Sequence, residues 1–403
     1  MGMHVALEYL AIGILLIAVI LAAGQMIEAP ARTVETVRAE QLLTAAERLM
    51  DKILLTPGYP ENWGSDLLPD ENVTDFGLSL AGAMAPYIVD PDKVMRLANL
   101  TPLPNPVPIS AEKIAELLGI KGEYGFRLEM KPMITTEVET IAYAAEIASS
   151  FRVQAVNWYG IGLPNARVTG IYVVAFVKGG AGQAELEDLD SSSTTCVTDA
   201  LGYCVLDYTS FIQGLRFGKG DFLSTFLVLH INWEGFVSVT GYSPAPKEAP
   251  VHGYIIGNYI FLERLDNVTG ALIVKDEVVQ VVPQYALLLE ETEVEWCRAQ
   301  PNDPVWCHEV AGRVLPSRKK QGVNYLIGRV IYLERLSSHI IVFGKWKGQG
   351  LAVVVSRIPE IDICYGPGNV QPVNSVSLTR IAQIYNYPYV VRLTLWRWVE
   401  GSP

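Results

Sequence analysis

The stretch FRLEM, residues 126–130, marks the point at which helical and loop-like patterns give way to β patterns. Its residues alternate between apolar and polar, so in an extended strand the three apolar side chains would share one face. The same alternation recurs in residues 150–157 and in 389–398. The last of these segments is a candidate to return and pair with strands formed much earlier. The sequence therefore predicts mainly antiparallel β-structure from residue 124 onward.

Two β-rich domains are predicted in this part of the chain. The first, residues 151–245, contains the turn TDALGY at 198–203, in which Asp starts the turn and Gly supplies an unusual dihedral angle. This pattern resembles the strands and hairpins of immunoglobulin-like surface modules, which implies a β-sandwich without a reaction of its own. A proline-rich segment at 244–250 is the predicted connection to the second β-rich domain, residues 246–403.

The segment at 179–193 is rich in Gly, Ser and acidic residues and is predicted to be a loop. Carboxylate oxygens suit Ca²⁺, but their spacing here fits no EF-hand loop, and a solvated acidic loop is the favoured interpretation. No metal site is predicted. The carboxylates considered are Glu185, Glu187, Asp188 and Asp190.

Before residue 124 the patterns differ. Residues 57–150 are predicted to mix loops, short helices at 91–98 and 110–118, and the first strand. Ser110 is a good N-cap residue for the second of these helices. Trp63 is predicted to be a surface aromatic packed under the turn LTPGYPENWG at 55–64.

Residues 1–56 are predicted to form one long helix, which ends before Thr56-Pro57-Gly58. Residues 9–27 carry no charge and are long enough to span a bilayer, whereas residues 34–53 are charged and have apolar residues at helical spacing. The predicted fold class is therefore α+β, a long N-terminal transmembrane helix followed by mainly antiparallel β-sandwich domains. A cleaved secretory signal is the alternative for the apolar run.

The segment HVALEYL, residues 4–10, resembles the class III signal of archaeal type IV pilin-like proteins. Met3 and His4 stand where that pattern has Gly and Gln. The resemblance implies cleavage between Met3 and His4 by a prepilin-type peptidase, and it makes Glu8 the fifth residue of the mature chain. Glu8 would then pair with the freed N-terminal amine of a neighbouring subunit, and Tyr9 would begin the packing face. A headgroup-level carboxylate without a special role is the alternative for Glu8.

Other segments are similar, in the same order, to archaeal membrane proteins of this class. They are residues 55–64, 90–97 and 124–129, together with the C-terminal 395–398.

The five cysteines fall as two close pairs and one single residue. Cys196 and Cys204 flank the 198–202 turn, so a hairpin would bring them within disulfide reach, and Cys297 with Cys307 flank a second turn-rich loop. Such disulfides favour an oxidising exterior over the cytosol. A metal site beside Cys307 is the less favoured alternative, because no CxxC spacing exists. Three glycosylation sequons begin at Asn72, Asn99 and Asn267.

A net charge of −12 argues against a nucleic-acid partner. No nucleophile elbow, Walker loop or zinc-protease motif is present, so neither an enzyme nor a cofactor is expected, although a facing carboxylate pair is left open. The sequence predicts a pilin-like cell-surface structural protein, a minor or tip subunit of a type IV-like filament. Its expected partners are membrane lipid and other pilin-like subunits, and its expected location is the cell membrane with an extracellular domain. The alternative is a single-pass envelope or surface-layer-associated protein that does not polymerise.

Overall fold

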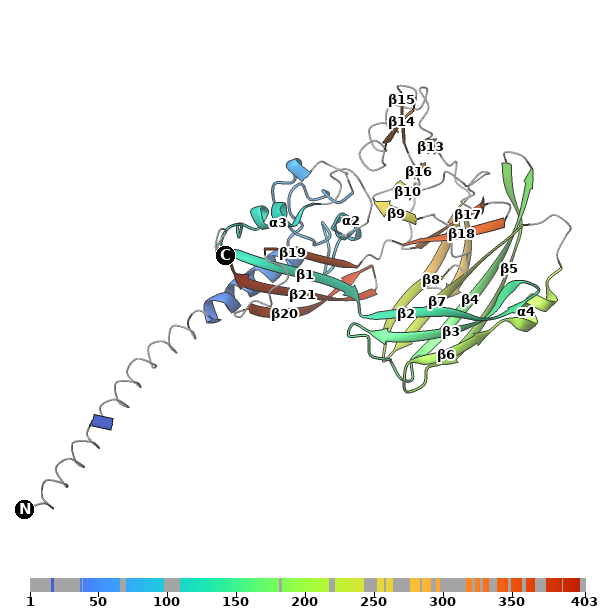
Figure 1. Cartoon of the computed structure of the whole chain (residues 1–403), viewed down its shortest axis with the longest axis horizontal. Coiled ribbons are helices and arrows are strands. Elements are labelled where there is room, and N and C mark those ends of the chain that lie inside the picture. The colour runs from blue at the N-terminus through green and yellow to red at the C-terminus, as the bar shows by residue number, and fades with distance from the viewer. Residues whose placement is uncertain are drawn as a thin grey trace, which may run out of the picture.

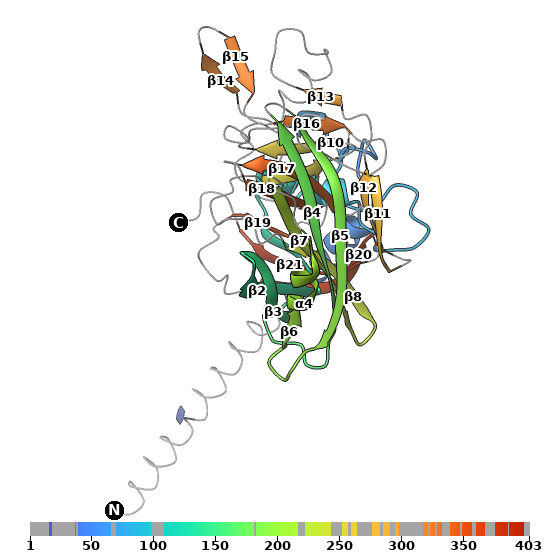
Figure 2. The same ribbon diagram turned by 90° about the vertical axis from the view of Figure 1, so that its right-hand side faces the viewer.

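The computed structural model contains two β units, which lie side by side in Figure 1. In Figure 2 the second unit faces the viewer and covers part of the first. It describes residues 16–17, 37, 39–65, 70–97, 109–180, 183–216, 222–242, 360–366, 375–385 and 387–398, and between residues 252 and 356 only the backbone of strands.

The first unit is built on a four-stranded antiparallel sheet, named the helix-bearing sheet, in the order β19-β1-β21-β20. The β1–β21 register places Leu128 opposite Leu393, and the alternation of each strand turns one apolar face to the core. The strands are β1 (Tyr124–Pro132), β19 (Ile361–Tyr365), β20 (Ser375–Ile384) and β21 (Tyr387–Arg397).

A helix over residues 39–55 packs its apolar face against this core (Figure 1). Its buried side chains recur every three or four residues, the spacing that lines one side of a helix. The helix ends at Leu55, directly before Thr56-Pro57-Gly58, as predicted. The core that the helix shares with β1 and β21 contains Leu42, Ala46, Leu49, Met50, Ile53, Leu54, Phe126, Leu128, Met130, Val391, Leu393 and Leu395.

Short helices complete this unit: η1 (Asp70–Asn72), α2 (Pro91–Met95) and α3 (Ala111–Leu117). The side chain of Ser110 accepts a hydrogen bond from the backbone N–H of Lys113, which confirms the predicted N-cap.

The second unit is a β-sandwich of two antiparallel sheets, β2-β3-β6 and β5-β4-β7-β8. Between them lies an apolar core that includes Phe151, Tyr172, Leu206 and Leu229. The elements are β2 (Ile134–Ala144), β3 (Ile147–Asn157), β4 (Arg167–Gly180), β5 (Gln183–Val197), β6 (Tyr203–Asp207), α4 (Thr209–Gly214), β7 (Phe222–Trp233) and β8 (Phe236–Tyr242).

The remaining strands are described by their backbone. They form the sheet β13-β16-β10-β9 and the three pairs β11-β12, β14-β15 and β17-β18, and β18 lies against β7. Their bounds are β9 (His252–Ile256), β10 (Tyr259–Glu263), β11 (Asp276–Val282), β12 (Tyr285–Glu290), β13 (Glu295–Cys297), β14 (Ser317–Lys320), β15 (Val323–Leu326), β16 (Arg329–Tyr332), β17 (His339–Trp346) and β18 (Gln349–Ser356).

The fold class predicted from the sequence, α+β with a long N-terminal transmembrane helix, is wrong. The chain is mostly antiparallel β-sheet, and no helix among the described residues is both long and apolar enough to cross a bilayer. The helix over 39–55 carries charged residues on its outer side and uses its apolar side to cover a sheet. The proposed span at 9–27 lies outside the described residues, apart from Leu16 and Ile17.

The prediction of an acidic loop at 179–193 is also wrong, because most of this segment is part of a strand. Residues 183–197 form β5, which pairs with β4 over its whole length. Because β5 is an edge strand, one of its sides needs no strand partner, and polar and acidic residues suit such an edge. Its composition therefore resembles that of a loop although its backbone is extended.

Strand pairing crosses the predicted domain divisions. β1, from the predicted 57–150 region, pairs with β21, from the predicted 246–403 domain, which confirms that the C-terminal strand returns to an earlier one. The predicted division between residues 150 and 151 falls inside β3. The divisions at 56 and 245 and the immunoglobulin-like character of the 151–245 region stay predictions.

Candidate functional site

The predicted processing and assembly residues, Met3, His4, Glu8 and Tyr9, lie outside the described residues. Of the three sequons, Asn72 is exposed at the end of η1, and Asn99 and Asn267 are outside the described part. Cys297 ends β13 and Cys307 is not described, so their disulfide stays a prediction.

Cys196 and Cys204 form a disulfide with their Cα atoms 6.0 Å apart. The bond was expected within a hairpin, but Cys196 belongs to β5 and Cys204 to β6, which lie in different sheets. It therefore covalently joins the two layers of the sandwich where the chain turns from one sheet to the other. The last cysteine, Cys364, is free and exposed on β19.

Reducing the Cys196–Cys204 disulfide should destabilise the sandwich by about 2–3 kcal/mol, because the crosslink restricts a short loop in the unfolded chain. The double variant Cys196→Ser/Cys204→Ser should reproduce this loss, measured as a lower thermal midpoint. Cys364→Ser is the matched control and should leave the midpoint unchanged, since that thiol is free and exposed. Equal midpoints with and without reductant would contradict this role.

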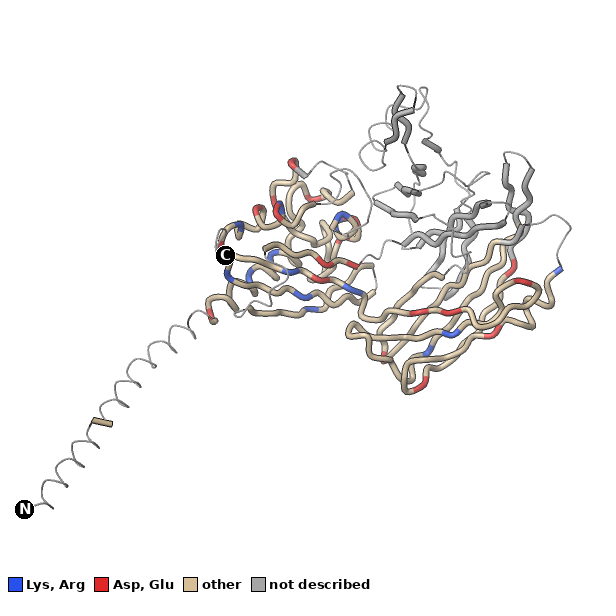
Figure 3. Tube along the Cα trace, viewed as in Figure 1, with Lys and Arg blue, Asp and Glu red and all other residues tan. Residues whose placement is uncertain are grey.

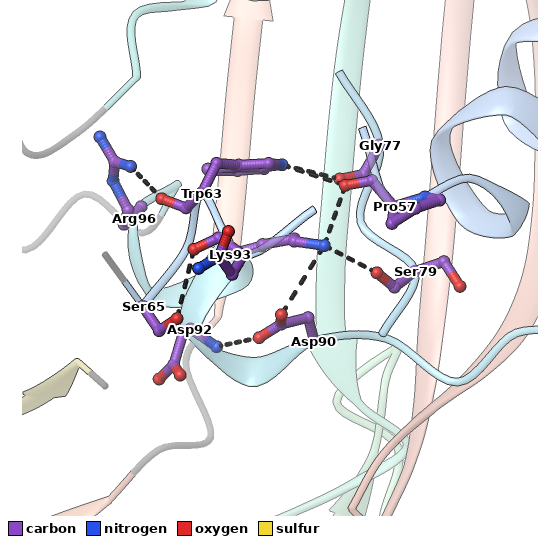
Figure 4. A network of polar contacts seen from close by, with 10 residues as sticks. Pro57, Trp63, Ser65, Gly77, Ser79, Asp90, Asp92, Lys93 and Arg96 are labelled. Atoms are coloured by element: carbon purple, nitrogen blue, oxygen red, sulfur yellow. Dashed lines mark hydrogen bonds and ion pairs between the residues drawn. The ribbon is translucent and has the colours of Figure 1, made fainter. Parts of the chain in front are cut away.

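A buried network of polar contacts lies at the end of the helix (Figure 4). It is named the Trp63 cluster and consists of Trp63, Asp90, Lys93 and Arg96. Trp63 comes from the loop after the helix, Lys93 lies in α2, and Asp90 and Arg96 are the N-cap and C-cap residues of α2. All four are buried, Trp63 and Lys93 completely.

Lys93 has three oxygen partners, two of which accept hydrogen bonds from it. Its Nζ donates to the carbonyl of Pro57 at 2.9 Å and to that of Ser79 at 2.8 Å, and it lies 3.7 Å from the Asp90 carboxylate. At 3.7 Å the Asp90 contact is an ion pair rather than a hydrogen bond, so the ammonium donates two hydrogen bonds and faces one carboxylate. Burial lowers the pKa of Lys93, and the nearby Asp90 carboxylate opposes that shift.

Asp90 also accepts a hydrogen bond from the backbone N–H of Asp92 at 2.9 Å and so caps α2. Its pKa is raised by burial first and by the charge of Asp92 second, while Lys93 and the backbone hydrogen bonds lower it. The carboxylate therefore holds both the start of α2 and the Lys93 ammonium.

Trp63 contacts both cations and two loop carbonyls. Its Nε1–H lies 3.2 Å from the carbonyl of Pro57 and 3.2 Å from that of Gly77. Lys93 Nζ lies 6.0 Å and Arg96 Cζ 5.5 Å from the ring centroid, within the range of cation–π attraction. Arg96 also donates a hydrogen bond to the backbone carbonyl of Trp63. Trp63 was predicted to lie at the surface, and that prediction is wrong because these partners enclose it.

The contacts of the Trp63 cluster indicate a structural role, which is to hold neighbouring segments together. The Lys93 ammonium is completely buried and held by two carbonyls and the Asp90 carboxylate, so groups of the protein itself enclose it. Backbone atoms approach too closely for larger residues, since a Cβ on Gly77 would lie 2.2 Å from the carbonyl of Thr56. The cluster thus ties the end of the helix to residues 77–79 and to α2. Among the described residues, no group of three or more His, Cys, Asp or Glu side chains could hold a metal ion.

Basic and acidic residues both occur in each of the two β units (Figure 3). No protein-family model and no curated protein matches this chain. Function is therefore inferred from the chain's own residues.

Proposed function

We propose that this chain is a pilin-like structural protein of the cell surface, a minor or tip subunit of a type IV-like filament, and not an enzyme. The observation that carries the proposal is the way the helix over 39–55 is built into a β unit. Its apolar face shares a core with β1 and β21, and the Trp63 cluster fixes its end. A subunit that contacts its neighbours through an N-terminal helix needs such a rigid attachment to its outer domains.

Two further features support a role outside the cytosol. The Cys196–Cys204 disulfide suits an oxidising compartment. The segment at 4–10 resembles a class III signal, which would place Glu8 opposite the amine of a neighbouring subunit after cleavage. The alternative is an envelope or surface-layer-associated protein of the same fold that does not polymerise.

N-terminal mass spectrometry distinguishes these two proposals. Protein from cell envelopes and from sheared surface filaments should begin at His4 if a prepilin-type peptidase processes the chain and the product assembles. An intact Met1 or Gly2, with no protein in the filament fraction, would contradict the pilin-like function and favour the envelope protein.

Glu8→Ala should abolish incorporation into filaments, because it removes the carboxylate that would neutralise the amine of the next subunit. The amount in sheared filaments, relative to that in the cell envelope, is the measurement. Glu47→Ala is a matched control, since Glu47 is an exposed carboxylate on the described part of the helix. Unchanged filament content in Glu8→Ala would remove the charge-pair role.

A further inference from the structure

The junction between the two β units is short. β1 ends at Pro132 and β2 begins at Ile134, so a single residue, Met133, separates a strand of the helix-bearing sheet from a strand of the sandwich (Figure 1). The N–H of Met133 donates to the carbonyl of Pro388 at 2.9 Å, and Ser238 on β8 donates to the carbonyl of Ile134 at 3.1 Å. The chain is thus held on both sides of the junction.

A tight turn of the sandwich reaches the helix-bearing sheet near this junction. The turn follows β3 and is built by Asn157, whose side chain accepts hydrogen bonds from the N–H groups of Tyr159 and Ile161 at 2.9 and 3.0 Å. Gly160 supplies the positive φ of 76° that closes the turn. Trp158 and Tyr159 therefore project together, with ring centroids 6.4 Å apart and ring planes nearly perpendicular.

Two cations of the helix-bearing sheet lie over these rings. Arg392 on β21 places its guanidinium carbon 5.3 Å from the Trp158 centroid and 5.9 Å from the Tyr159 centroid. Lys131 on β1 places its Nζ 5.9 Å from the Trp158 centroid. These contacts connect the two units through side chains, in addition to the covalent junction at Met133.

Arg392 is oriented by a row of charges across the sheet. It lies opposite Glu129 in the β1–β21 register, with 4.0 Å between its guanidinium and the carboxylate. Glu129 also lies 3.7 Å from Arg127, which makes two hydrogen bonds to Asp362 on β19, at 2.8 and 2.6 Å. These bonds lower the pKa of Asp362 and keep it ionised. The row spans β21, β1 and β19 and holds the guanidinium in place for the rings.

We propose that the Trp158–Tyr159 turn is a lock that fixes the angle between the β-sandwich and the helix-bearing sheet by seating Arg392 and Lys131 against its aromatic rings. Because β1 carries the core on which the helix packs, the lock makes the sandwich and the helix move as one body. The units also share apolar contacts near β8 and β21, including Val239 and Tyr387, so opening the lock loosens the junction without separating the units.

Hydrogen exchange and spin-label distances on the full chain test the lock. In Trp158→Ala, the Met133 amide should exchange about tenfold faster, the effect expected when cation–π contacts that hold a local structure are lost. The distance distribution between spin labels on the native Cys364 and on Tyr143→Cys should broaden, because these exposed positions lie on different units. Core amides of each unit, such as those of Val153 and Leu393, should keep their protection.

A second variant and a matched control keep the test specific. Arg392→Gln removes the opposite side of the same contact and should give the same changes as Trp158→Ala. Arg152→Gln is the control, because Arg152 lies 6.0 Å from the Tyr203 ring within the sandwich and does not span the junction. Unchanged exchange and distances in both lock variants would overturn the proposal. Equal loss of protection in the unit cores and at Met133 would also overturn it, since Trp158 would then support only general folding.

Discussion

Replacing Lys93 with methionine is expected to lower the stability of the helix-bearing unit by about 3–5 kcal/mol, the cost of breaking a buried ion pair. Methionine keeps most of the apolar length of the side chain but removes the Lys93 donor from the carbonyls of Pro57 and Ser79 and the cation from the Asp90 carboxylate. The Pro57 carbonyl retains the Nε1–H of Trp63. The expected result is a thermal midpoint about 10 °C lower, measured by calorimetry.

The partner of Lys93 provides an internal check. Asp90→Asn keeps a side chain able to cap α2 but removes the charge, so combining it with Lys93→Met should cost less than the sum of the two single changes. Lys113→Met is the matched control, because its ion pair with Glu116 is on the surface and worth less than about 1 kcal/mol. If the thermal midpoint of Lys93→Met were as high as that of Lys113→Met, the Trp63 cluster would not stabilise the end of the helix.

Trp63→Ala is expected to lower the free energy of unfolding by a similar amount, about 3–5 kcal/mol. The side chain is completely buried, its ring packs beside Phe76 with centroids 6.0 Å apart, and its Nε1–H contacts two carbonyls. Alanine would leave a cavity at the point where the helix, residues 77–79 and α2 meet. Denaturant unfolding followed by far-UV circular dichroism measures the loss.

Trp63→Phe separates packing from hydrogen bonding. Phenylalanine retains the six-membered ring, so the free energy of unfolding should fall by about 1–3 kcal/mol, the cost of removing the donor from the Gly77 carbonyl, while the Pro57 carbonyl still accepts from Lys93. Tyr143→Ala removes an aromatic residue that is 69% exposed and should change stability by less than about 0.5 kcal/mol. If Trp63→Ala resembled Tyr143→Ala, the tryptophan would have no part in holding the segments together.

Sequence patterns correctly predicted those features of the fold that are determined by residues close together in the chain. The end of the helix before Pro57 and the N-cap at Ser110 both follow from the chemistry of neighbouring residues, and the structure confirms both. The alternation in 389–398 identified β21 and raised its return to an earlier strand, which the pairing with β1 bears out. The strand β5 was missed because an edge strand needs few apolar residues, so its Ser-rich and acidic sequence has no β signature.

The candidate site was harder to predict because its contacts are distant along the chain. Trp63 is enclosed by Lys93 and Arg96 and by the carbonyl of Gly77, and no periodicity near residue 63 reports these partners. The sequence analysis singled out 55–64 and 90–97 as separate segments, but it did not show that they meet. Likewise, the spacing of Cys196 and Cys204 predicted their bond but not that it joins two sheets.

The central position of β21 in the helix-bearing sheet has a consequence for synthesis of the chain. During translation, the helix over 39–55 and β1 emerge early, but β1 lacks its central partner until residues 387–397 leave the ribosome. Until then the apolar face of the helix has only part of its covering, a state that chaperones and proteases recognise. A chain that terminates before residue 387 would lack β21 and leave part of that apolar face uncovered. The core between the helix and the sheet is therefore complete only in molecules translated through β21.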